Sequence, residues 1–210
     1  NNRFTTAQLT LLGLMAAILL LMAYTPLGYL NIGPLAVTFN VIPVAVCAIV
    51  LGPTGGAIAG AVFGLTSFMQ AIGIGGVSAL GSALFQINPF MTAVQCFGPR
   101  ILDGICIGFI YRAVHKKANT YVSCAVTGFF SAFLNTLFFM TALIVMFGNT
   151  ELIRNLMGGH NIIVGCCLMV GVNAISEMVS STIITAAVGT ALSKAHLIPA
   201  VQIVKTDTAA

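Results

Sequence analysis

The sequence predicts an all-α integral membrane protein built from six transmembrane helices. Hydrophobic residues make up 59% of the 210 residues and charged residues only 6%, a composition typical of chains that lie mostly in lipid. The apolar residues come in long runs, near or above the roughly 20 residues that a helix needs to cross a bilayer. Because main-chain polar groups in lipid must pair internally, helices are the expected form of these runs.

The six apolar runs are separated by turn-rich or polar breaks. The first ends before a stretch rich in Pro and Gly, and the second stops at Gly52-Pro53. The fourth ends in a basic cluster that closes with Lys116 and Lys117. The sixth is too long for one straight crossing, so we expect it to project from the membrane or to break near Gly171. The predicted helices are residues 6–24, 35–51, 55–70, 88–111, 120–147 and 157–193.

The basic residues orient the predicted bundle. If the N-terminus is cytoplasmic, six of the lysines and arginines lie on the cytoplasmic side of the membrane. Among the loop residues only Arg154, beside Glu151, then lies outside. This asymmetry follows the positive-inside rule and predicts that both termini are cytoplasmic. The cytoplasmic residues would be Arg3, Arg112, Lys116, Lys117, Lys194 and Lys205.

One transmembrane domain is therefore expected over residues 6–194, with a polar cytoplasmic tail over residues 195–210. Three loops would face outward, at residues 25–34, 71–86 and 148–156. The first two carry no charge. They are long enough to cover a binding site that opens to the outside.

Arg100 is the most informative single residue. It follows Pro99 inside the fourth apolar run, with Asp103 one turn further on. A cation at this depth costs about 2.5–3.5 kcal/mol on insertion scales, so it usually faces a partner or a polar cavity. Two interpretations remain open: Arg100 binds a solute, or it pairs with Asp103 or Glu177 and only ties helices together.

Polar residues gather on single faces of three predicted helices, because residues three or four apart share a face. Three such stripes favour a cavity, although interhelical hydrogen bonds worth about 0.6 kcal/mol each are the alternative. An arginine suits a carboxylate or phosphate, and amide side chains suit hydroxyls and amides. The expected ligand is a small polar or anionic solute. The stripes contain Asn88, Thr92, Gln95, Pro99 and Asp103; Gly128, Ser131, Asn135 and Phe138; and Asn173, Ser176, Glu177 and Ser180.

Motifs for catalysis are missing from the sequence. It contains neither a GxxxxGK[ST] phosphate loop nor an HExxH pair, which argues against ATP hydrolysis or zinc chemistry by those routes. The six cysteines lie in apolar runs without CxxC spacing, as expected of packing residues. We expect no enzyme activity, no cofactor and no metal. The basic residues lie in loops and termini and need no nucleic-acid partner.

Small residues predict close helix contacts, because they let helix backbones approach in lipid. Internal packing suffices for one such face on the third helix, made by Gly56, Gly60 and Gly64. The small face of the first helix could pack internally or be presented to another subunit. That face consists of Gly13, Ala16 and Ala17.

Several motifs, in this order, resemble the substrate-binding S components of energy-coupling factor (ECF) vitamin transporters. They are Pro26-Leu27-Gly28, Thr38-Phe39-Asn40, Ile42-Pro43, Leu51-Gly52-Pro53, Gly55-Gly56-Ala57, Phe63-Gly64-Leu65-Thr66-Ser67-Phe68 and Pro99-Arg100. The resemblance implies a multi-pass protein of a bacterial cell membrane that binds one vitamin from outside. It also implies partners, namely a transmembrane T component and two ATPase subunits. The S component would topple in the membrane and so carry its site toward the cytoplasm. In the family an AxxxA face on the first helix meets the T component, and Gly13 and Ala17 stand at the matching positions here.

Within this family the chain looks most like the pantothenate type, because Arg100 and Asn135 suit a carboxylate together with hydroxyl and amide groups. The absence of Trp argues mildly against the thiamin and biotin types, and the absence of a Lys-rich signature against the riboflavin type. Another vitamin such as riboflavin or folate, or a structural protein in which Arg100 is only a helix tie, stays an alternative. The expected substrate-binding residues are Arg100, Asn135, Asn88, Gln95, Asn40, Asn173, Glu177, Asn31 and Tyr29.

Overall fold

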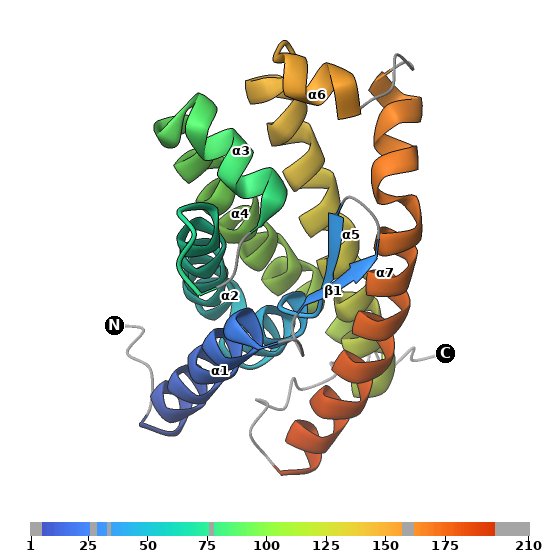
Figure 1. Ribbon diagram of the computed structural model, residues 1–210. Coiled ribbons are helices and arrows are strands. Elements are labelled where there is room, and N and C mark those ends of the chain that lie inside the picture. The colour runs from blue at the N-terminus through green and yellow to red at the C-terminus, as the bar shows by residue number, and fades with distance from the viewer. Residues whose placement is uncertain (1–5, 26–28, 33–34, 76–77, 157–161, 196–210) are drawn as a thin grey trace.

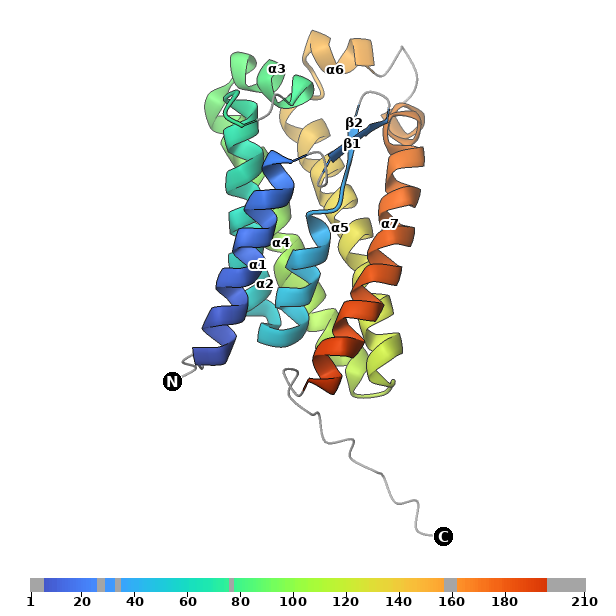
Figure 2. The same cartoon turned by 60° about the horizontal axis from the view of Figure 1, so that its bottom comes forward.

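The computed structural model describes residues 6–25, 29–32, 35–75, 78–156 and 162–195, with side chains at 29–32, 35–37, 156, 162–170 and 172 left undescribed. The long helices run side by side, as Figure 1 shows. The shorter elements α3, α6 and the β-hairpin lie at one end of the bundle, opposite the start of α1 and the end of α7 (Figure 2). The elements are α1 (Thr6–Tyr24), β1 (Tyr29–Ile32), β2 (Leu35–Thr38), α2 (Val41–Ala71), α3 (Ala79–Ile87), α4 (Pro89–His115), α5 (Thr120–Phe147), α6 (Glu151–Leu156) and α7 (Ile162–Lys194).

The long helices have the length and composition of membrane spans. Among the described residues five helical segments qualify, namely α1, α2, α4, α5 and the part of α7 from Asn173 to Lys194. Large apolar side chains point away from the bundle, with Phe90 and Val145 each 78% exposed. Such an apolar exterior suits lipid contact, and the predicted class, a helical membrane protein, is confirmed.

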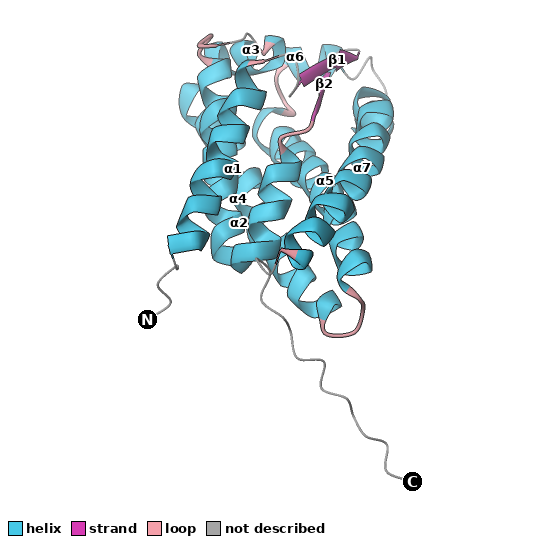
Figure 3. Cartoon of the chain, turned by 90° about the horizontal axis from the view of Figure 1, so that it is seen from below, coloured by secondary structure: helices cyan, strands magenta, loops and turns pink. Residues whose placement is uncertain are grey.

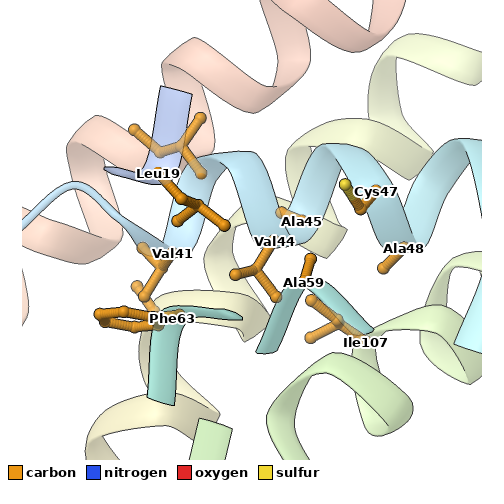
Figure 4. Packing of buried hydrophobic residues seen from close by; sticks show 11 residues of the cluster. Leu19, Val41, Val44, Ala45, Cys47, Ala48, Ala59, Phe63 and Ile107 are labelled. Atoms are coloured by element: carbon orange, nitrogen blue, oxygen red, sulfur yellow. The ribbon is translucent and has the colours of Figure 1, made fainter. Parts of the chain in front are cut away.

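Helix α2 folds back on itself at Gly52. This residue has φ 70° and ψ −163°, a conformation that only glycine adopts without strain. It separates a first arm, residues 41–51, from a second arm, residues 53–71. Val44 packs with Ala59 and Phe63 in one buried cluster (Figure 4). In a straight helix Val41 and Phe63 would be about 33 Å apart at 1.5 Å per residue, so the two arms lie side by side.

The first arm of α2 occupies the centre of the molecule, and every residue from 41 to 53 is buried. The predicted second helix was wrong at its start, because residues 35–38 form strand β2 and the helix begins at Val41. Strand β2 pairs antiparallel with β1 (Figure 3). Hydropathy does not separate a buried strand from a helix. Non-helical backbone is tolerated at membrane depth where protein surrounds it.

The second arm of α2 packs closely against α4 along its glycines, as predicted. A Cβ atom on Gly56 would collide with the main chain of Gly104, and one on Gly60 with the main-chain oxygen of Arg100. Gly64 approaches the main chain of Cys96 in the same way. The contact repeats every turn, so it fixes the position of the Arg100 backbone against α2.

Two predicted loops contain short helices. Helix α3 lies mostly within the predicted loop 71–86, and the Ser78 hydroxyl caps it by accepting from the Gly81 N–H at 3.1 Å. Helix α6 lies in the predicted loop 148–156. Both are far shorter than a membrane span. Their apolar residues Leu84 and Ile153 are buried against Phe147 of α5, so they close one end of the bundle.

Of the two alternatives for the sixth helix, the structure excludes a break at Gly171. Helix α7 runs unbroken from Ile162 to Lys194, past Gly171. The earlier start at residue 157 lies outside the described residues, as does all of the predicted tail except Ala195. The predicted helices 6–24 and 120–147 agree with α1 and α5.

Candidate functional site

Helices α4 and α5 bring their polar stripes together in a regular antiparallel register. The Gln95 side-chain amide donates to the Phe139 carbonyl at 2.8 Å. Two turns along both helices, the Ser131 side chain lies beside the Asp103 carboxyl group. Asn135 lies midway between Ser131 and Phe139 on α5. It therefore stands level with the Pro99–Arg100 pair of α4.

Arg100 is held by contacts from three helices. Its Nη1 donates to the Gln95 carbonyl on α4 at 2.9 Å. Its Cζ atom lies 5.4 Å from the centre of the Phe63 ring on α2 and 4.6 Å from that of Phe139 on α5. Both distances lie within the roughly 6 Å over which an aromatic face attracts a cation. These contacts fix the position of the guanidinium between α2, α4 and α5.

Buried amide side chains lie at or near the level of Arg100 in the bundle. Among the described residues, Gln95 Oε1, Asn135 Oδ1 and both polar side-chain atoms of Asn40 have no hydrogen-bond partner. An unsatisfied buried polar group costs about 1–3 kcal/mol, so such groups usually meet a ligand or water. Asn40 joins the cluster through its neighbour Val41, whose carbonyl accepts from the Ser131 hydroxyl at 3.3 Å.

Glu177 connects the β-hairpin to α7. Its Oε1 accepts a hydrogen bond from the Thr38 main-chain N–H at 2.6 Å. Glu177 is 6% exposed, and the charge of Arg100 acts on its carboxyl group as well as on that of Asp103. The end of strand β2 therefore reaches into the bundle at the depth of the polar cluster.

The structure brings most of the predicted binding residues together. Arg100, Gln95, Asn135 and Asn40 form the cluster described above. Asn173 is buried one turn from Glu177 on α7, and the Ser181 hydroxyl bonds to the Gly128 carbonyl at 2.8 Å. That contact sets α5 and α7 in an antiparallel register that brings Asn173 to the level of Asn135.

One predicted residue, Asn88, stands apart from the cluster, and two others are not described at the level of their side chains. The Asn88 side chain caps α4 by accepting from the Met91 N–H at 3.1 Å. It lies two turns before Gln95, or roughly 10 Å at 1.5 Å per residue, so the structure does not bring it into the cluster. Tyr29 and Asn31 belong to strand β1, and their side chains lie outside the described part of the chain.

Two aromatic residues beside Arg100 were not among the predicted site residues. Phe139 lies four residues after Asn135, so the helical period places it on the polar stripe of α5. The prediction placed Phe138, three residues after Asn135, on this stripe. A spacing of four residues would have selected Phe139 instead. Phe63 lies on another helix, and no pattern in the sequence pairs it with Arg100.

The small face of α1 points outward. Gly13 and Ala17 are exposed, and a Cβ atom on Gly13 would meet nothing within 4 Å. Ala16 is half-buried. Among the described residues these small positions are therefore not used as a close internal contact in the way that Gly60 is.

Comparison with known proteins shows which family the chain belongs to. The family described as "ECF transporter, substrate-specific component" matches residues 7–189. The chain is 33% identical to the pantothenate transporter PanT of Leuconostoc mesenteroides, over 91% of this chain and 94% of the relative. It is 27% identical to the pantothenic acid transporter PanT of Lactococcus lactis subsp. cremoris, over 90% and 95%.

Proposed function

Because the chain belongs to the substrate-specific components of ECF transporters, we propose that it is the subunit that binds pantothenate for uptake into the cell. It is a multi-pass membrane protein and a transporter component. Two relatives that align with at least 90% of it are named for this one vitamin. This agreement over nearly the full chain supports the same ligand here.

One observation in the structure carries the proposal: the level of the bundle that holds Arg100 also holds buried amide oxygens with no hydrogen-bond partner among the described residues. Pantothenate is a small acid with an amide and hydroxyl groups. Its carboxylate suits the guanidinium, and its hydroxyl and amide protons suit Gln95 Oε1 and Asn135 Oδ1. Asn40, which offers both a donor and an acceptor, would complete the set.

Glu177 and Asn173 are proposed as the α7 side of the same site. Glu177 holds the Thr38 N–H, so it would position strand β2 over bound vitamin. Tyr29 and Asn31 of the hairpin remain proposed contacts from above. For Asn88 we propose only a supporting part, since its side chain caps α4.

The proposed partners follow from the family. The sequence has no GxxxxGK[ST] phosphate-binding loop, which fits a family in which separate subunits hydrolyse ATP. We propose a transmembrane T component and two ATPases, with the outward face of α1 at Gly13, Ala16 and Ala17 meeting the T component. Small residues permit the close approach that association in lipid requires.

The proposed topology has six crossings and cytoplasmic termini, within one domain over residues 6–194 and with a polar tail after it. The two arms of α2 count as separate crossings, the first of which begins as strand β2. Basic residues Arg112, Lys116, Lys117 and Lys194 lie at or beside the ends of α4 and α7. This end would face the cytoplasm by the positive-inside rule.

The test is calorimetric titration of the purified protein in detergent with pantothenate, riboflavin, folate, thiamin and biotin. We expect saturable one-to-one binding of pantothenate and no heat from the other four vitamins. A folded protein that binds a different vitamin would keep the family and change the ligand. Failure to bind any of the five would favour Arg100 as a helix tie.

A further inference from the structure

We propose that Phe63 and Phe139 form an aromatic clamp that orients the Arg100 guanidinium and makes the site select a carboxylate over a neutral group. The inference rests on the proposed function, because it concerns how that same site chooses its ligand. It assigns the two phenylalanines as positioning residues, which act on the ligand through Arg100.

The clamp acts from two different helices on one side-chain group. Phe63 belongs to the second arm of α2 and is only 2% exposed, so its ring has little room to move. Phe139 belongs to α5 and approaches more closely, with 4.6 Å between its ring centre and Cζ of Arg100. The bond from Arg100 Nη1 to the Gln95 carbonyl adds a third restraint. Three restraints from three helices define the orientation of the guanidinium before any ligand arrives.

The backbone below the clamp is equally constrained. Gly60, one turn before Phe63 on α2, lies against the main-chain oxygen of Arg100. The same close contact therefore sets the height of Phe63 relative to the arginine. On the α5 side, the Gln95 amide bonds to the carbonyl of Phe139 itself. The main chains that carry both rings are therefore held at fixed positions along α4.

Aromatic faces stabilise a cation without neutralising it, because a ring supplies only the negative face of its quadrupole. An oriented arginine also presents its donors in a rigid fork that matches a carboxylate. Because preorganisation removes an ordering cost from binding, the clamp should favour ligands that use the charge.

A neutral ligand should depend much less on the clamp. A hydrogen bond from the guanidinium to a hydroxyl lacks the ionic part that roughly doubles the strength of a bond to a carboxylate. Panthenol, the alcohol in which a hydroxymethyl group replaces the carboxylate of pantothenate, is a suitable probe. It keeps the amide and hydroxyl groups that would meet Gln95 and Asn135.

The experiment measures the dissociation constants of pantothenate and panthenol for the wild type and for Phe139→Leu. We expect the preference for pantothenate over panthenol to fall roughly tenfold, as the loss of one desolvated cation–π contact implies. Binding of panthenol should remain within about twofold, which also shows that the variant is folded. The Phe139 carbonyl that accepts from Gln95 is retained in the variant.

Two further variants separate a positioning role from simple packing. Phe139→Tyr keeps the aromatic face and should keep the wild-type preference. Phe133→Leu removes an exposed ring from the same helix, one that stacks on Phe129 instead, and should change nothing. An equal loss of both ligands in Phe139→Leu, or an unchanged preference, would overturn the clamp while leaving the proposed function intact. If the folded wild type binds neither ligand, the proposed function fails and the clamp fails with it.

Discussion

Arg100 is held in the bundle by groups that attract a cation, and its charge also acts on the carboxyl groups of Asp103 and Glu177. One main-chain carbonyl and two aromatic rings surround the guanidinium. The arginine itself could be found from the sequence, since a cation in an apolar run stands out. The residues that orient it could not, because Phe63 comes from a helix distant in sequence and aromatic residues are common throughout the apolar segments.

Removal of the Arg100 side chain should abolish most of the affinity for pantothenate. We expect Arg100→Ala to weaken binding by roughly tenfold to a hundredfold or more, as the loss of a charge-assisted hydrogen bond worth about 1.5–3 kcal/mol predicts. Titration calorimetry gives the affinity, and gel filtration with a thermal melt reports the fold.

A matched control is available in Arg154→Ala, which removes an exposed arginine from α6 and should bind as the wild type does. An Arg100→Ala protein that aggregates or melts far below the wild type would instead identify Arg100 as a helix tie. A folded variant with unchanged affinity would exclude Arg100 from the ligand site.

At the scale of single elements, the glycine faces of α1 and α2 have opposite uses. The glycines of the second arm of α2 are buried against α4, whereas Gly13 and Ala17 of α1 are exposed. The sequence predicted the internal contact correctly but left the α1 face open between two uses. Spacing alone says that a backbone can approach, and only the position of the helix in the bundle shows whether an internal neighbour is there.

The exposed face of α1 should matter for transport and not for binding. We expect Ala17→Leu to leave the dissociation constant of pantothenate within about twofold, because exposed substitutions rarely disturb the fold. It should reduce uptake of labelled pantothenate several-fold in cells that also make the T component and ATPases, since added bulk prevents close approach.

Ala7→Leu is the control, because it adds the same bulk at the exposed start of α1 and should transport normally. If Ala17→Leu loses vitamin binding while the complex still assembles, the α1 face serves the ligand site. Normal uptake by Ala17→Leu would remove this face from the proposed interface.

The whole molecule has two chemically different ends. One carries α3, α6 and the β-hairpin, and the other carries the ends of α4 and α7 with their basic residues (Figure 2). Hydropathy predicted the long helices well, because each buries or exposes a continuous apolar run. It missed β2, α3 and α6, since a short apolar segment has the same composition in a strand, a loop or a helix.

The proposed topology can be read from reporter fusions. Green fluorescent protein fused after Lys117 should fluoresce, because the positive-inside rule places that end in the cytoplasm. Alkaline phosphatase fused after Asn149 should be active, because α6 would lie outside. The exchanged pair, with each reporter at the other site, serves as the control and should be silent at both positions. Activity of the exchanged pair would show that the bundle has the opposite orientation in the membrane.

The bend at Gly52 has a consequence for how the protein enters the membrane during synthesis. The first arm of α2 has 11 residues, about 16 Å of helix, which is roughly half of a bilayer's hydrocarbon core. It is also enclosed by other helices in the finished protein. Such a segment is too short to span the hydrocarbon core as a helix by itself. We therefore expect the translocon to retain it until the second arm has emerged, so that the two arms insert together as a helical hairpin around Gly52.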